Sequence, residues 1–109
     1  MMTEFTEFII VLITAQKEEE AAEIAKDIVG KKLAACVNIV RGVRSIYRWR
    51  GKTEDEEEVL MVVKSRRTLF PDLMKRVKEL HRYTVPEIIA LPIIEGSEEY
   101  LGWLKEETG

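Results

Sequence analysis

The sequence predicts an α+β domain in which an antiparallel sheet carries two helices on one face, and three observations lead to this prediction. Strand-like apolar segments and amphipathic helical segments follow one another in the order strand, helix, strand, strand, helix, strand, helix. Gly51 separates the two adjoining strand patterns and predicts a hairpin between them. The length of 109 residues suits a single domain spanning 1–109. This order is that of the split βαβ, or ferredoxin-like, arrangement.

The first strand and the first helix have the clearest patterns. Residues Phe8–Ile13 form a continuous apolar run, which is typical of an interior strand covered on both faces. Within Lys17–Lys32 the apolar residues recur at helical spacing, at Ala21, Ile24, Ala25, Ile28 and Val29. Acidic residues open this segment and lysines close it, as the helix dipole favours. We therefore expect a helix whose alanine-rich face packs closely on its neighbours.

A long strand and a hairpin follow the first helix. Residues Leu33–Trp49 have a strand-like pattern that is interrupted at Gly42, and a glycine inside such a pattern suggests a bulge or bend. Gly51 and Lys52 are expected to form the hairpin turn, and the chain should return as a third strand over Glu57–Ser65.

Five consecutive acidic residues, Glu54–Glu58, stand between the two strand patterns. A run of like charges at a hairpin is usually a solvated turn, and no pair within this run has a spacing diagnostic of a site. We interpret the run as a soluble turn.

The second half of the chain repeats the alternation of helix and strand. Leu69–His81 is amphipathic, with Pro71 in a position suited to a first helical turn. Pro86 marks the entry to a fourth strand at Glu87–Ile93, and Ser97 is placed to cap a short final helix.

The strands are apolar on both of their faces. In the third strand Val59, Met61 and Val63 alternate with the equally apolar Leu60 and Val62. Two helices cover only one face of a four-stranded sheet, so the other face should meet another copy of the chain. An interface of standard size, about 1,600 Å², can offset the entropy of association. We predict an obligate homo-oligomer.

Composition excludes several classes of protein. A net charge of −3 does not favour nucleic-acid binding. The longest apolar run, Phe8–Ile13, has only the length of a strand and acidic residues precede it, so we expect neither a membrane span nor a signal peptide. The single cysteine, Cys36, excludes an internal disulfide framework and fits a cytoplasmic protein. A single Asn and a single Gln in a Glu- and Lys-rich chain suggest thermostability.

His81 and Cys36 are the residues most suited to binding a metal. His81 is the only histidine and ends the second helix, where it either caps the helix or binds a metal. Cys36 lies in an apolar run, where it is either a core residue or a thiolate ligand. Imidazole and thiolate together suit copper, provided that the fold or the oligomer brings them together.

A second set of residues has the character of a cleft. Trp49, Lys64 and Tyr83 are candidates for lining one, with Tyr47 on the same strand face as Trp49, and each has an alternative role in rim packing. The sequence has no dinucleotide-binding, phosphate-loop, nucleophile-elbow or zinc-protease motif, so we do not expect an enzyme.

Five ordered motifs resemble one known family. They are Lys32–Asn38 (KLAACVN), Ser45–Lys52 (SIYRWRGK), Glu58–Ser65 (EVLMVVKS), His81–Ile88 (HRYTVPEI) and Tyr100–Leu104 (YLGWL). In order and spacing they resemble the CutA family, from the first strand to the last helix. The resemblance implies a small cytoplasmic protein linked to divalent-cation tolerance, especially to copper, that forms a trimer of ferredoxin-like subunits. No catalytic activity is established for that family.

The resemblance also bears on individual sites. In well-known bacterial members copper ligands are assigned to a cysteine at the end of the first strand and to two consecutive histidines; here those positions hold Ile13, Leu80 and His81. His81 is the one that remains, and the family's His-Pro-Tyr becomes His81-Arg82-Tyr83. Cys36 matches the cysteine of the family's Ala-Ala-Cys motif.

Two functions follow as hypotheses. The first is a CutA-type trimer that responds to divalent metal ions and binds copper or another divalent cation weakly at clefts between subunits, near His81 and Cys36. The alternative is a small-molecule sensor or interaction scaffold similar to the PII signalling proteins, in which Trp49, Lys64 and Tyr83 line a cleft for an anionic ligand.

Overall fold

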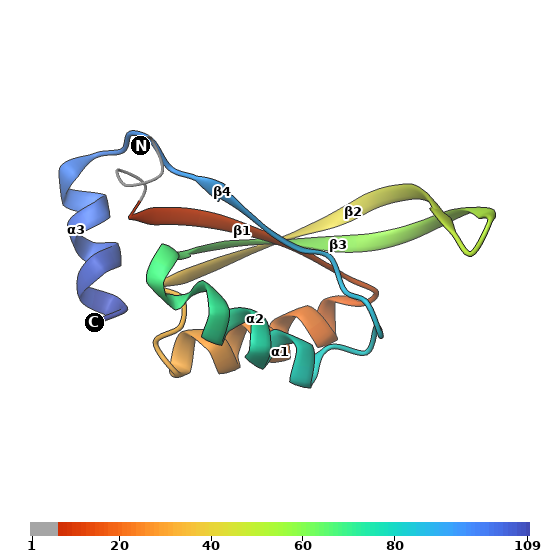
Figure 1. Cartoon of the computed structure of the whole chain (residues 1–109), viewed down its shortest axis with the longest axis horizontal. Helices are drawn as coiled ribbons and strands as arrows, with labels where there is room; N and C mark the ends of the chain where they lie inside the picture. Colours follow the sequence, from red (N-terminus) through yellow and green to blue (C-terminus); the bar gives the residue numbers. More distant parts are fainter. Residues whose placement is uncertain (1–6) are drawn as a thin grey trace.

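The computed structural model describes residues 7–109 as one sheet with helices packed against it (Figure 1). The predicted order of elements is confirmed, and Ser97 caps the last helix by accepting a hydrogen bond from the Tyr100 N–H. The elements are β1 (Phe8–Ala15), α1 (Glu18–Gly30), β2 (Cys36–Trp49), β3 (Lys52–Arg66), the 3₁₀ helix η2 (Arg67–Leu69), α2 (Phe70–Leu80), β4 (Ile88–Pro92) and α3 (Glu98–Glu107). None of the helices in the described range has the length and apolar character of a membrane span.

The strands are ordered β2-β3-β1-β4, and every neighbouring pair is antiparallel. α1 and α2 lie side by side against one face of the sheet, and α3 lies at the end of the sheet where β1 begins (Figure 1). The predicted ferredoxin-like α+β fold is thereby confirmed.

The core lies between the sheet and the two helices. Along β1 burial alternates strictly, because Ile9, Val11, Ile13 and Ala15 point toward the helices. Met61 extends this layer on β3, while Ile24 and Leu73 extend it on the helices, and each of these three side chains is at most 1% exposed. The alanines of α1, Ala21 and Ala25, are buried in the same cluster, as expected for a face that packs closely.

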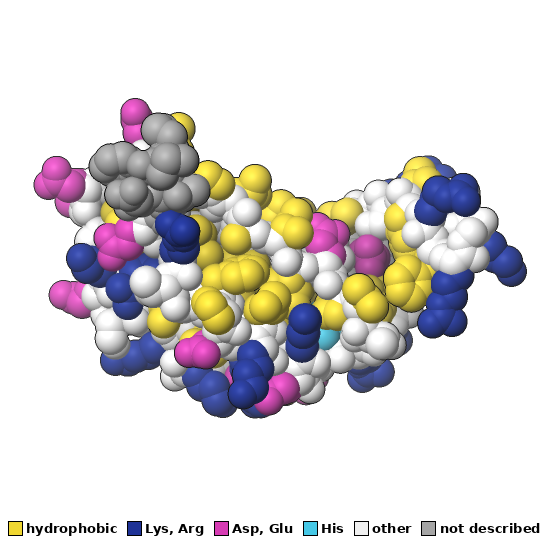
Figure 2. Space-filling view, viewed as in Figure 1, with side chains coloured by type: hydrophobic (Ala, Val, Ile, Leu, Met, Phe, Trp, Pro, Cys, Tyr) yellow, Lys and Arg dark blue, Asp and Glu magenta, His cyan; other side chains and the backbone are white. Residues whose placement is uncertain are grey.

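The opposite face of the sheet is apolar and uncovered over its middle, as the pattern on both strand faces predicts. By register Ile10 and Leu12 of β1 share this open face with Leu60 and Val62 of β3. Three of its members are largely exposed: Val40 at 44%, Ile89 at 50% and Leu91 at 45%. Figure 2 shows hydrophobic side chains gathered over the sheet between α3 and the β2–β3 hairpin. A surface of this kind marks an interaction site.

A β-bulge in β2 decides which side chains face one another in the hairpin. Val40 pairs with Leu60 but Val43 pairs with Glu58, so β2 has one extra residue, and Gly42 takes a φ of 73° there. The bulge was predicted at this glycine. Because side chains alternate along a strand, the extra residue brings Val43 and the odd-numbered residues after it to the open-face side.

The interpretation of Glu54–Glu58 as a turn is wrong. β3 begins at Lys52, and the turn consists of Arg50 and Gly51, both with positive φ, as in a two-residue hairpin loop. The acidic residues form a regular strand because β2 supplies partners opposite them. Arg44, for example, donates two hydrogen bonds to the Asp55 carboxylate, at 2.9 and 2.6 Å.

An ion pair joins the two helices beneath the sheet. The Arg76 guanidinium of α2 donates from Nε and Nη2 to the two oxygens of Asp27 on α1, both at 2.8 Å. Lys31 Nζ donates to Asp27 Oδ2 at 3.0 Å. Chiefly because of these hydrogen bonds, the pKa of the Asp27 carboxyl lies well below its usual range.

Replacing Asp27 by Asn should make the stability of the protein less sensitive to acid. A carboxyl with a lowered pKa in the folded state stabilises the fold above its unfolded pKa, and this contribution is lost as the pH falls toward its folded pKa. The free energy of unfolding of the unmodified chain should therefore fall more steeply below about pH 4 than that of Asp27→Asn, which should be less stable at neutral pH. Urea unfolding across this pH range measures both.

The exposed Asp72 at the start of α2 provides the control, since Asp72→Asn leaves the Arg76–Asp27 pair intact. Equal acid sensitivity of the unmodified chain and Asp27→Asn would contradict the role given to this ion pair.

Candidate functional site

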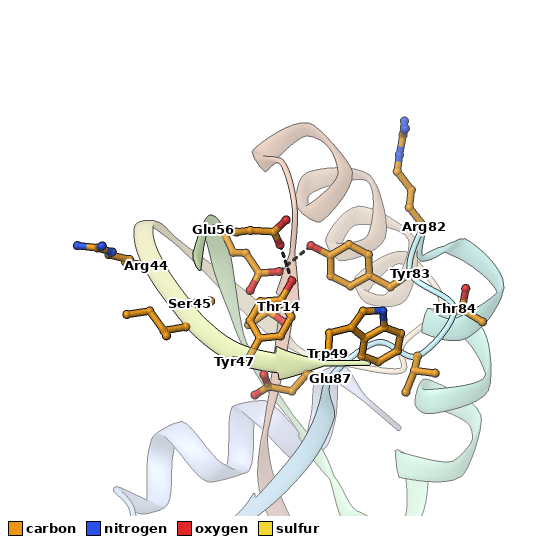
Figure 3. Close-up of a pocket in the computed structure, with 13 residues that line it drawn as sticks. Thr14, Arg44, Ser45, Tyr47, Trp49, Glu56, Arg82, Tyr83, Thr84 and Glu87 are labelled. Carbon is orange, nitrogen blue, oxygen red and sulfur yellow. Dashed lines mark hydrogen bonds between the residues drawn. The ribbon is translucent and has the colours of Figure 1, made fainter. Parts of the chain in front are cut away.

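A cavity of about 810 Å³ lies between the β2–β3 hairpin and the segment that leads from α2 to β4 (Figure 3). It is larger than a metal ion needs and falls within the size range of small-molecule sites. Its walls comprise Thr14 of β1, Arg44, Ser45, Ile46, Tyr47 and Trp49 of β2, Glu56 and Glu58 of β3, and Arg82, Tyr83, Thr84, Val85 and Glu87 of the connecting segment.

Two tyrosine–carboxylate pairs meet at the centre of the cavity (Figure 3). Tyr47 Oη donates a hydrogen bond to Glu56 Oε1 at 2.5 Å, and Tyr83 Oη donates one to Glu58 Oε2 at 2.7 Å. Tyr83 comes from a segment far away in sequence, so its bond to β3 ties the loop to the hairpin. Glu58 is only 5% exposed, although it is charged.

Burial and hydrogen bonds to carboxylates together raise the pKa values of both tyrosines. The hydrogen bond to Glu56 is the largest cause for Tyr47, followed by burial and by the charges of nearby glutamates, and its pKa rises to about 12. Burial is the largest cause for Tyr83, followed by the hydrogen bond to Glu58, and its pKa rises further above the usual value. Both hydroxyls therefore remain protonated donors at neutral pH, in a region of negative potential.

In the part of the chain that the structure describes, no ion pair neutralises the two central carboxylates. Within residues 7–109 neither Glu56 nor Glu58 forms a salt bridge. Arg44 lines the cavity but is bound to Asp55. The Arg82 side chain points away from the two tyrosines in Figure 3. The centre of the cavity is therefore acidic.

His81 lies behind the cavity, and its side chain is fully buried. Its Nε2 donates to the Thr14 carbonyl at 2.8 Å, and its Nδ1 accepts from the Tyr83 N–H at 3.0 Å. The ring also contacts the Tyr83 ring, with centroids 4.8 Å apart. Both ring nitrogens are thus engaged, and their geometry positions Tyr83. The expected helix-end position is confirmed, because the His81 N–H bonds to the Val77 carbonyl as the C-cap of α2.

A buried carboxylate supports the same segment from α1. Glu20 is 6% exposed, and its Oε2 accepts a hydrogen bond from the Arg82 N–H at 2.8 Å. The Nδ1 of His81 lies 3.6 Å from the same oxygen. Glu20 and His81 therefore hold two successive backbone N–H groups, those of Arg82 and Tyr83, and fix how the segment enters the cavity.

The structure does not bring Cys36 and His81 together within one chain. Cys36 pairs with Lys64, whereas Thr14, which His81 contacts, pairs with Leu60. Four residues along β3 correspond to about 13 Å. Cys36 is half-buried near Asn38, with its Sγ 3.9 Å from Asn38 Oδ1.

Of the three predicted cleft residues, Trp49 and Tyr83 line the cavity together and Lys64 does not. Lys64 donates to Asn38 at the other end of the sheet, six residues or roughly 20 Å along β3 from Glu58. Within one chain Lys64 therefore does not join these two residues, and glutamates lie beside them instead. That all three residues line a cleft between subunits stays a prediction.

Residues that the sequence interpretation missed carry the centre of the site. Glu56 was assigned to a solvated turn, and Glu58, although it also falls in the predicted third strand, was interpreted as part of the same acidic run. The detectable signal was the alternation of glutamates at 54, 56 and 58 opposite Ser45 and Tyr47, once the bulge at Gly42 is included in the register.

No group of three or more His, Cys, Asp or Glu side chains within the described residues is arranged to hold a metal ion.

Fold and site together define a class: a ferredoxin-like α+β protein with an acidic, aromatic pocket beside an open apolar sheet face. Comparisons with known proteins identify the family. Residues 9–107 match the model of the CutA1 divalent ion tolerance protein family. The chain therefore belongs to the CutA family, as its five motifs predicted.

Individual relatives agree along nearly the whole chain. The divalent-cation tolerance protein CutA of Thermus thermophilus is 58% identical over 100 residues, which cover 92% of this chain and 97% of that protein. A solved structure of the divalent cation tolerance protein from the same organism has a TM-score of 0.91 and 57% identity, covering 94% of this chain and 99% of the other. The chloroplastic CutA of Arabidopsis thaliana is 47% identical over 92% of this chain, which spans 55% of that relative.

Proposed function

We propose that this protein acts in the response to divalent metal ions as a homotrimer that binds them weakly in the acidic cavity, without enzymatic turnover. The observation that carries the proposal is the pair of carboxylates, Glu56 and Glu58, which face the cavity without a cationic partner among residues 7–109. Carboxylate oxygens are ligands that divalent cations such as Mn²⁺ accept. The family's divalent-cation tolerance points to the same class of ligand.

Assembly is part of this proposal. The open apolar face offers the surface that a second and third copy would cover, and the cavity adjoins it because Glu58 and Leu60 lie on the same side of β3. Since one chain lacks three converging donors within the described range, the remaining ligands would come from water or from a neighbouring copy. Weak binding is what such an incomplete ligand set supports.

Copper is a narrower possibility within the same proposal. His81 would have to release the Thr14 carbonyl or the Tyr83 N–H to offer a nitrogen to copper. Cys36 would have to come from another subunit, because it lies far from His81 in its own chain.

The cytoplasm remains the proposed location, because a single free cysteine fits a reducing compartment. Thermostability likewise remains a proposal, from the charge-rich composition.

Replacing Glu58 by Gln should weaken binding of Mn²⁺ by roughly tenfold or more, because a charged ligand is lost while the bond to Tyr83 is kept. Isothermal titration on the assembled protein measures the affinity, and native mass spectrometry gives subunit number and bound mass. Glu57→Gln on the opposite side of β3 is the matched control and should bind as the unmodified chain does. Equal affinity in all three proteins would remove the carboxylates from the proposal.

The copper site at His81 has its own test. A copper affinity that falls in His81→Gln and not in the glutamate variants would favour it.

A small-molecule sensor is the second candidate, and the size of the cavity favours it. A volume of about 810 Å³ with Tyr47, Trp49 and Tyr83 in its walls exceeds what a lone cation requires. The two candidates share the same carboxylates and differ in the ligand.

A further inference from the structure

The cavity combines two features that a metal ion alone does not need. Its centre holds two carboxylates, and its walls hold three aromatic rings, Tyr47, Trp49 and Tyr83. Aromatic faces attract organic cations through their electron-rich surfaces and also cover alkyl chains. A hydrated metal ion gains little from such walls, whereas an ammonium group attached to a hydrocarbon chain uses both features.

The chain itself shows that Trp49 receives a cation. The Arg50 guanidinium lies over the Trp49 ring, 5.5 Å from its centroid. Arg50 is not among the residues that line the cavity, whereas the indole of Trp49 is. Trp49 therefore contacts a cation of its own chain and also lines the cavity.

Hydrogen-bond acceptors are concentrated at the centre. Each tyrosine hydroxyl donates its only proton to a carboxylate, so its oxygen can still accept a hydrogen bond. In each of Glu56 and Glu58, the carboxylate oxygen that is not bonded to a tyrosine has no hydrogen bond in the described part of the chain. An ammonium group carries three N–H donors and no acceptor, and it complements this set.

We propose that the cavity binds an alkyl amine carrying one or two ammonium groups, with Glu56 and Glu58 holding the charged end and Trp49 and Tyr83 covering the hydrocarbon chain. This rests on the proposed role of the two carboxylates as a cation site and names the class of ligand that fits the rest of the cavity. Glu56 and Glu58 lie two residues apart on one strand face, about 7 Å, so one ammonium reaches both through adjacent oxygens.

The arginines near the cavity do not occupy the position proposed for the ammonium group. Arg44 is held by Asp55 through two hydrogen bonds, and Arg82 extends outward. Glu87 adds a third carboxylate to the walls. An anionic ligand would meet these three carboxylates instead and is disfavoured.

Isothermal titration of the full-length assembled protein tests the inference with three probes of similar length: putrescine, butanediol and succinate. We expect saturable binding of putrescine and none of the neutral or anionic analogue. Glu58→Gln and the exposed Glu56→Gln should each weaken putrescine binding by roughly tenfold or more. Trp49→Leu, which keeps an apolar side chain but removes the ring, should weaken it by roughly threefold or more. Glu57→Gln should leave it unchanged.

Mn²⁺ titrated into the same proteins separates the inference from the proposed function. Putrescine binding that depends on Glu56 and Glu58 supports the inference even where Mn²⁺ does not bind. Binding of Mn²⁺ without binding of putrescine overturns the inference and leaves the divalent-cation proposal standing. Equal binding of putrescine and butanediol, or binding of putrescine that survives in both glutamate variants, also overturns it.

Discussion

Replacing Leu60 by Asp should convert the proposed trimer to monomers at concentrations on the order of micromolar. Leu60 lies near the middle of the open face, between its partners Thr14 on β1 and Val40 on β2. In the proposed trimer each copy would bury this side chain, and a carboxylate there would be removed from water without a partner. Such burial costs several kcal/mol for each subunit. Native mass spectrometry and light scattering both report the number of subunits.

Val29→Asp is the matched control for this experiment. Val29 is an apolar residue of α1, 39% exposed, on the helical side of the sheet and away from the open face. It should keep the assembly of the unmodified chain. A Leu60→Asp protein of unchanged mass would show that the open face is not the surface of association.

Replacing Met61 by Ala should lower the free energy of unfolding by about 2–5 kcal/mol. Met61 is the next residue along β3, but it points to the other side, where it is 0% exposed in the layer between sheet and helices. Truncation removes buried methylene groups and leaves a cavity that the surrounding strands cannot close. Denaturant unfolding at one fixed protein concentration measures the loss, because the proposed assembly would make stability depend on concentration.

Met61→Leu should cost less than about 1.5 kcal/mol, since it nearly conserves volume and hydrophobicity. Together with Leu60→Asp, this pair separates the two faces of one strand. Met61→Ala should destabilise each subunit, whereas Leu60→Asp should act on association. A Met61→Ala protein as stable as Met61→Leu would mean that the core relaxes around the lost side chain.

The fold was predictable because its signals are local. The apolar run at Phe8–Ile13, the helical spacing within Lys17–Lys32 and the glycines at 42 and 51 each specify an element or its interruption without distant partners. The apolar character of both strand faces was also visible in Val59–Val63, and the structure confirms that one face is left uncovered. The ends of the elements were predicted less accurately. β3, for example, begins at Lys52, ahead of its apolar residues, whereas the prediction began at Glu57.

The site was only partly predictable because it depends on distant contacts. Trp49 and Tyr83 were found as aromatic residues beside a strand end and before a proline. The bond from Tyr83 to Glu58 joins residues 25 positions apart, and no local pattern encodes it. The acidic run was assigned to a turn on its charge, whereas cross-strand partners such as Arg44 and Tyr47 stabilise it as a strand. His81 has the expected position, and its two hydrogen bonds could be known only from the fold.

The β2–β3 hairpin extends beyond the rest of the sheet, and this has a consequence for local opening. β1 pairs with β3 only as far as Val59, while β2 and β3 remain paired to Trp49 and Lys52. A ribbon of two strands has little stability by itself, so its backbone amides should exchange with solvent sooner than those of the four-stranded part. The Tyr47–Glu56 pair lies on this ribbon, and Tyr83 anchors its base through Glu58. Occupation of the cavity would therefore slow hydrogen exchange in a segment that the remaining strands do not protect.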